Sequence, residues 1–172
     1  MRLDRKLAIV TGGASGLGEA MVRRFVDEGA NVVVADIDEK AGQNLASELG
    51  NTCQFIRLDV SQEQDWQHIM AKFDRVDILV NNAGITTFGN IEAVTLEQFK
   101  HEFEIDVVGV FLGCKHVIPS MKQHGGSIIN IASMCAVRAQ PDLVAYNGAK
   151  AAVTHMTRSV ALHCAREKYG IR

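Results

Sequence analysis

The chain has 172 residues, of which 47% are hydrophobic and 22% charged, and it contains two prolines. This composition is that of a folded globular protein and excludes a disordered one. The net charge of −2 is typical neither of nucleic-acid-binding proteins nor of proteins held to anionic membranes by charge. The length predicts a single domain over residues 1–172.

Cysteine and histidine spacing argues against metal and disulfide frameworks. The four cysteines form no C-x-x-C pair, and the six histidines show no H-x-x-x-H spacing. We therefore expect reduced, mostly buried thiols and no metal site. The first apolar run, Leu7–Val10, is too short for a secretory signal, and no stretch approaches the roughly 20 apolar residues of a membrane helix. These features predict a soluble, cytoplasmic protein.

In chain order, short apolar strands alternate with amphipathic helices. The predicted strands of the first half span 7–10, 31–36, 53–60 and 76–84, and the predicted helices span 17–29, 38–49 and 61–73. Gly29 and Gly50 follow the first two helices as stop signals, and Ser61 is expected to cap the third.

The second half continues the alternation. Thr95 is expected to cap a long helix that runs to Met121 and is interrupted at Gly109 and Gly113. A strand over 127–133 and a helix over 144–168 follow. Strands that are apolar throughout and alternate with helices indicate a parallel sheet covered on both faces. The sequence therefore predicts a doubly wound, three-layer αβα Rossmann fold.

A glycine-rich segment, TGGASGLG over 11–18, joins the first strand to the first helix. Gly12, Gly16 and Gly18, with Ser15 and Leu17 between them, would let backbone amides approach a pyrophosphate at the positive end of the helix. A tight turn without a ligand is the alternative. The position at the first strand-to-helix turn favours dinucleotide binding.

An acidic residue at the end of the second strand supports the same site. Asp36 follows the glycine segment by about 20 residues, the spacing at which a carboxylate accepts the ribose hydroxyls of an adenosine. The carboxylate would repel a 2′-phosphate, and neither Ser15 nor Ile37 supplies a cation there. We therefore expect NAD rather than NADP, with a turn-capping role for Asp36 as the alternative.

A possible acid–base group lies near the start of the last helix. Tyr146 and Lys150 are four residues apart, which places them one turn apart on one helix face. The ammonium favours the phenolate, so that Tyr146 can exchange a proton with an alcohol or ketone. Ser133, at the carboxyl end of the fifth strand, is placed to hold the substrate oxygen. Taken singly, each of the three has an ordinary structural explanation.

Together, these motifs resemble the short-chain dehydrogenase/reductase family. The matching segments are TGGASGLG (11–18), Asp36, LDV (58–60), NNAG (81–84), Ser133 and Tyr146-x-x-x-Lys150. The resemblance implies that Asp59 and Val60 flank the adenine, and that Asn82, Ala83 and Gly84 support the cofactor. It also implies that Lys150 binds the nicotinamide ribose. The strings FLGCKHVIPSM and GGSIINIAS are similar to members that act on cyclic alcohols and hydroxysteroids.

The chain departs from the family pattern in two places. Asp106 stands where members usually carry an asparagine that helps hold a water on the proton relay, so we expect an altered pH dependence; a structural aspartate is the alternative. Members also continue beyond the Gly170–Arg172 segment, so we expect a fold that lacks the last two strands and leaves the fifth strand as an edge. The resemblance also implies a homo-oligomer, because members of the family dimerise through the helices that correspond to 95–123 and 144–168.

Two functions follow from these features. The first is an NAD-dependent oxidoreductase for a secondary alcohol or ketone, in which Ser133, Tyr146, Lys150 and Asp106 carry the chemistry. The second is a truncated, non-catalytic protein that binds a nucleotide or pairs with a partner. In the first function the expected partner is a small-molecule alcohol or ketone. Neither function involves nucleic acid or a membrane.

Overall fold

The computed structural model describes all of residues 1–172. Five strands form one parallel sheet in the order β3-β2-β1-β4-β5. The strands are β1 (Leu7–Thr11), β2 (Asn31–Asp36), β3 (Cys53–Arg57), β4 (Ile78–Asn81) and β5 (Ser127–Asn130). The strand order reverses at β1, between β2 and β4, and ligands of such sheets bind at the carboxyl ends of the strands beside this reversal.

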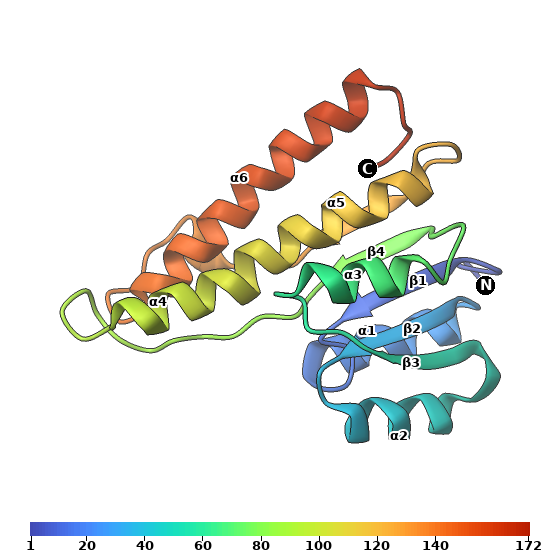
Figure 1. The fold of residues 1–172 in the computed structure, drawn as a ribbon, viewed down its shortest axis with the longest axis horizontal. Coiled ribbons are helices and arrows are strands. Elements are labelled where there is room, and N and C mark those ends of the chain that lie inside the picture. Colours follow the sequence, from blue (N-terminus) through green and yellow to red (C-terminus); the bar gives the residue numbers. More distant parts are fainter.

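Helices cover both faces of the sheet (Figure 1). They are α1 (Gly16–Asp27), α2 (Glu39–Leu49), α3 (Glu63–Met70), α4 (Leu96–Phe103), α5 (Gly109–Met121) and α6 (Val144–Arg166). Val22 of α1 and Leu45 of α2 belong to the core on one face, and Trp66 of α3 and Leu112 of α5 to the core on the other. Helix α6 lies beside α5. The predicted α/β Rossmann architecture is confirmed.

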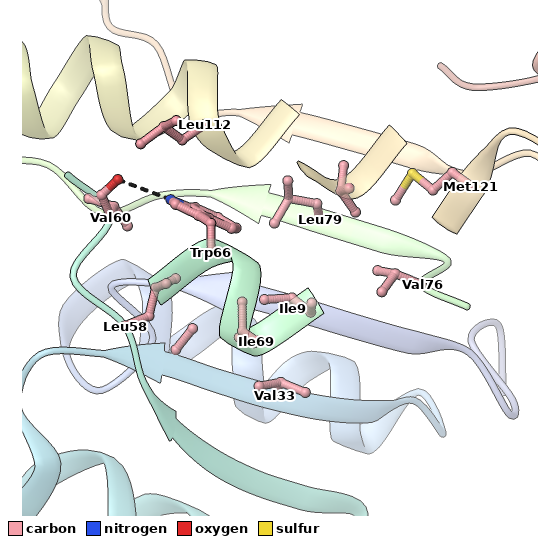
Figure 2. Packing of buried hydrophobic residues seen from close by; sticks show 12 residues of the cluster. Ile9, Val33, Leu58, Val60, Trp66, Ile69, Val76, Leu79, Leu112 and Met121 are labelled. Carbon is pink, nitrogen blue, oxygen red and sulfur yellow. Dashed lines mark hydrogen bonds between the residues drawn. The ribbon is translucent and has the colours of Figure 1, made fainter. Parts of the chain in front are cut away.

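The larger core fixes a segment that will border the functional site. Trp66 is fully buried, and its indole Nε1 donates a hydrogen bond of 3.0 Å to the carbonyl oxygen of Val60 (Figure 2). Leu58 is buried in the same cluster. The residues that follow β3 are therefore held against the sheet by side-chain packing, although they form no strand.

Several local predictions are wrong. The strands expected over 76–84 and 127–133 are shorter, at Ile78–Asn81 and Ser127–Asn130, so Ser133 lies beyond the end of β5. The strand expected over 53–60 ends at Arg57, and the LDV residues lie beyond it. Ser61 does not cap α3: Gln62 precedes the helix, and the Ser61 hydroxyl instead donates to Asp59 Oδ1 at 2.7 Å. The long helix is interrupted at Glu104–Val108, a π-helical segment, and not at its glycines.

The two glycines of the long helix do not interrupt it but allow it to pack closely against neighbouring segments. A Cβ on Gly109 would come within 2.8 Å of Val60 Cγ2, and one on Gly113 would overlap the side chain of Asn81. These two positions let α5 approach the end of β4 and the segment after β3. The expected cap at the other end of the long helix is confirmed, since Thr95 and Gln98 form a reciprocal capping box.

The last residues of the chain pair with β5. The Ile128 amide donates to the Arg172 carbonyl at 2.8 Å, and the Arg172 amide donates to the Gly126 carbonyl at 3.1 Å. A parallel bridge joins Gly126 to Ile171. Ile129 of β5 is 40% exposed, as expected for a strand at the edge of the sheet. None of the helices is both long enough and apolar enough to cross a membrane.

Candidate active site

A cleft of about 420 Å³ opens at the carboxyl ends of β1, β2 and β4, beside the reversal in strand order. It brings together residues from five separate segments of the chain. Those that the sequence predicts are Gly12, Ser15, Gly16, Leu17, Gly18, Asp36, Asp59, Val60, Asn82, Ala83 and Gly84. Four further lining residues are apolar: Ile37, Leu58, Ile85 and Ile105. Ile85 and Ile105 are the two that the sequence analysis did not name. A larger cavity of about 530 Å³ lies at the opposite ends of the strands and contains none of the motifs.

The glycine loop is packed directly against the turn after β4. Gly12 has a φ of +60°, and a Cβ there would come within 2.8 Å of Ala83 Cα. A Cβ on Gly18 would overlap the Gly12 carbonyl oxygen. The Asn82 Nδ2 donates to the carbonyl oxygens of Thr11, at 2.9 Å, and Gly12, at 3.1 Å. Both loops are therefore held in one conformation, and glycine is required where their backbones meet.

Thr11 is a positioning residue that the sequence analysis missed. Its side chain is buried at the end of β1, and its hydroxyl donates to the Val80 carbonyl at 3.3 Å. The same oxygen accepts the backbone amides of Asn82, at 3.0 Å, and Ala83, at 3.1 Å. The sequence does show a hydroxyl residue at the last position of the first strand. Because this strand pairs with β4, a hydroxyl there can reach the backbone of the turn that follows β4.

The Asp36 carboxylate is held at the rim of the cleft by two backbone amides. Its Oδ2 accepts from Ala14 at 3.0 Å, and its Oδ1 accepts from Asp38 at 3.0 Å. Each oxygen keeps a lone pair for a further donor. Lysine and arginine are absent from the residues that line the cleft. The nearest cation along the sheet, Arg57, is paired with Asp65 at 3.1 Å.

The three residues proposed for chemistry lie on two elements that pack together, the short helical turn η3 (Met134–Ala136) and α6. Ser133 precedes this turn, and its Oγ accepts the Cys135 amide at 3.1 Å. Tyr146 and Ser133 are half-buried, whereas Lys150 is buried. The Lys150 Nζ lies 5.5 Å from the centre of the Tyr146 ring and donates to the Ile131 carbonyl at 3.2 Å. The ammonium therefore faces the tyrosine at the carboxyl end of β5.

Asp106 forms a direct ion pair with the lysine. The carboxylate has no exposed surface and lies in the π-helical segment, with Oδ2 2.9 Å from Lys150 Nζ. Its Oδ1 accepts the Ile85 amide at 2.8 Å. A Cβ on Gly84 would come within 3.0 Å of the same carboxylate. Asp106 thus connects the turn after β4 to Lys150 through a direct ion pair.

Comparisons with known proteins agree with this arrangement. The family model described as short chain dehydrogenase matches residues 6–172. The 3-beta-hydroxysteroid dehydrogenase of Comamonas testosteroni is 46% identical over 99% of this chain and 69% of its own length. The 3-alpha-(or 20-beta)-hydroxysteroid dehydrogenase of Mycobacterium tuberculosis is 39% identical over 94% of this chain and 64% of its own. The NADP-dependent (R)-specific alcohol dehydrogenase of Lentilactobacillus kefiri is 38% identical over 99% and 71%. The chain thus spans about two thirds of the length of these relatives.

Proposed function

The chain belongs to the short-chain dehydrogenase family, and we propose that it is an oxidoreductase that moves hydride between NAD(H) and a secondary alcohol or ketone. One observation carries the proposal. The cleft and the Tyr146–Lys150 pair are joined by two contacts of the buried Asp106 carboxylate, a hydrogen bond from the Ile85 amide after β4 and an ion pair with Lys150. A cofactor cleft that is connected to an acid–base group supports an oxidoreductase more than a protein that only binds a nucleotide.

The cleft fits a dinucleotide. The first amides of α1, at Gly16, Leu17 and Gly18, have no acceptor within the helix and lie at its positive end, where a pyrophosphate is stabilised. Asp36 would accept the adenosine ribose hydroxyls, and the apolar Val60 would lie against the adenine. The bound nicotinamide supplies the hydride donor or acceptor, and the residues of the chain supply the rest.

The absence of cations from the cleft lining supports NAD over NADP. A 2′-phosphate would meet the Asp36 carboxylate without a counter-charge, because the guanidinium of Arg57 is held by Asp65 and Glu39. The relative from Lentilactobacillus kefiri is named as NADP-dependent, so family membership does not decide the cofactor. The local charge is therefore the argument for NAD in this chain.

Proton transfer is assigned to Tyr146. The Lys150 ammonium stabilises the phenolate, which takes the proton of an alcohol as the carbinol carbon loses hydride. In the reverse direction the phenol donates this proton to the ketone oxygen. The Ser133 hydroxyl already accepts the Cys135 amide, so its proton is free to be donated to the substrate oxygen.

The expected substrate is a cyclic or steroid-like secondary alcohol. Two hydroxysteroid dehydrogenases among the relatives support this class by their names. The side chains just after Ser133 agree with it, since Met134 is 61% exposed and Val137 is 79% exposed. These apolar groups would face a hydrophobic ring system whose hydroxyl reaches Ser133.

Self-association through α5 and α6 belongs to the same proposal. Phe111 of α5 is 50% exposed and Leu162 of α6 is 73% exposed. Large apolar side chains at the surface of neighbouring helices are typical of an interface. Light scattering of the wild type and of a Phe111→Lys, Leu162→Lys variant would test it, with a drop in mass expected for the variant.

The proposed activity is tested with purified wild type and Tyr146→Phe. We expect calorimetry to show NAD binding by both proteins, and NADH absorbance to appear with cyclic secondary alcohols only for the wild type. Tyr169→Phe, a phenol outside the site, is the matched control and should keep its activity. Binding without turnover in the wild type would support the non-catalytic alternative.

A further inference from the structure

A second carboxyl group is buried beside the ion pair. The Glu102 side chain, on α4, has no exposed surface. Its Oε2 accepts the Thr87 amide at 2.9 Å, while Oε1 is buried with no hydrogen-bond partner. Helix α4 packs against both the π-helical segment of Asp106 and helix α6 of Lys150. The buried region therefore contains two carboxyl groups and one ammonium.

The surroundings offer no second cation. The turn that covers the carboxyls, residues 82–88, contains no titratable side chain and contributes the amides of Ile85 and Thr87. Helix α6 contributes Lys150 and, beyond it, Tyr146. The other charged groups of α4 and the π-helical segment, such as Glu104, are exposed. With both carboxyls ionised, this region would carry an uncompensated buried charge, which is costly.

The two carboxyls are not equivalent as proton carriers. Asp106 Oδ1 accepts the Ile85 amide, and Oδ2, which has no hydrogen bond, lies 2.9 Å from the Lys150 ammonium as its ion-pair partner. Glu102 has an oxygen with no partner of either kind, so a proton placed there removes the net charge without breaking a contact. Burial raises the pKa of Glu102 and the Asp106 charge adds to the rise, whereas the Thr87 amide and the Lys150 ammonium each lower it in part.

We propose that Glu102 is a protonated acid at neutral pH and acts as a positioning residue for Lys150. As a neutral acid it leaves the Asp106–Lys150 pair without net charge. As a carboxylate it makes this group of three negative, and the pull of Lys150 on the Tyr146 proton weakens. The second half of this statement rests on the proposed function, whereas the proton on Glu102 does not.

The proton is tested by unfolding, which needs no activity. The pKa of Glu102 is higher in the folded than in the unfolded protein. Protonation of Glu102 therefore stabilises the folded protein fully below the ordinary glutamate pKa, and this stabilisation is lost as the pH rises toward the pKa of the folded state. Above about pH 5, wild type releases one proton more on unfolding than Glu102→Gln does. The unfolding constant of wild type relative to Glu102→Gln should then rise about tenfold per pH unit. Glu104→Gln, exposed on the same segment, should behave as wild type.

Infrared spectra of the folded wild type give a second test that needs no variant to fold. Protein labelled with carbon-13 in its glutamate carboxyls should show an isotope-shifted carboxylic-acid band at pH 7. Where Glu102→Gln folds, this band should be missing from it. Equal proton release by wild type and Glu102→Gln, or no acid band in wild type, would overturn the proposal.

The positioning role is tested by the pH profile of alcohol oxidation. Glu102→Gln stays neutral, so its rate should rise at a lower pH than that of wild type and exceed the wild-type rate several-fold on the alkaline side. Superimposable profiles would overturn the positioning role. If wild type shows no turnover, the proposed function fails, and the proton count and the acid band still decide the state of Glu102.

Discussion

Replacing the Asp106 carboxylate with a neutral amide should shift the pH dependence of the reaction. Asp106→Asn keeps an oxygen that can accept the Ile85 amide, now 2.8 Å from Asp106 Oδ1, and removes the charge that lies 2.9 Å from Lys150 Nζ. The lysine then acts on Tyr146 without its counter-charge. A bare ammonium stabilises the Tyr146 phenolate more strongly than a paired one does.

The magnitude follows from the distance between the two groups. At 5.5 Å between Lys150 Nζ and the centre of the Tyr146 ring, an effective dielectric constant of about 20 gives about 3 kcal/mol of attraction between the ammonium and a phenolate. Asp106 Oδ2 lies 2.9 Å from Nζ and therefore at most about 8.4 Å from the ring centre, so the carboxylate opposes this by about 2 kcal/mol. Asp106→Asn should therefore stabilise the phenolate by about 2 kcal/mol. Glu102 can ionise once Asp106 is neutral, so the double variant with Glu102→Gln should show the larger shift.

The assay is kcat/KM for alcohol oxidation as a function of pH. Oxidation uses the phenolate, so the limb of the profile that rises with pH should move to lower pH by about 1.5 units. Loss of the buried pair should also destabilise the protein by up to about 3–5 kcal/mol, which a thermal melt measures. Glu104→Gln is the control for charge removal at an exposed position. A limb that stays in place or moves to higher pH would refute the reasoning.

Three further changes test the cleft and its support. Asp36→Ala removes two amide contacts and the acidic rim, so NAD binding should weaken on the order of tenfold while NADP binding improves, as measured by calorimetry. Unchanged preference would contradict the ribose role. Gly18→Ala forces a Cβ onto the Gly12 carbonyl and should abolish NAD binding. Gly50→Ala, where φ is +75° but an added Cβ would meet no atom within 4 Å, strains the backbone far from the cleft and should leave NAD binding intact. Trp66→Phe leaves the buried Val60 carbonyl without its donor and should cost about 1–3 kcal/mol in denaturant unfolding; no loss would show that water replaces the indole.

The architecture could be predicted because it depends on local patterns. Apolar runs such as that within Asn31–Asp36 indicate strands buried on both faces. Because helices connect these strands, the strands are expected to run parallel in one sheet. The residues of the cleft were predictable for the same reason. Their loops follow strands, and the carboxyl ends of parallel strands meet at one edge.

What could not be predicted depends on contacts between distant segments. Ser61 is of a residue type that often caps helices, but its hydroxyl donates a hydrogen bond to the nearby Asp59 carboxylate instead. A glutamate in a helix is ordinarily solvated, so nothing in the sequence of α4 shows that Glu102 is buried against Thr87 and near Lys150. The π-helical segment at Glu104–Val108 is a feature of the same kind, since it carries Asp106 into the site.

The most direct test of the account follows a deuterium atom. The purified protein is incubated with NAD⁺ and a cyclic secondary alcohol that carries deuterium at the carbinol carbon. The account predicts that deuterium appears on one face of the nicotinamide ring with wild type and that Tyr146→Phe, which still binds NAD, transfers none. Reduced cofactor without deuterium, or equal transfer by Tyr146→Phe, would contradict hydride transfer with Tyr146 as the acid–base group.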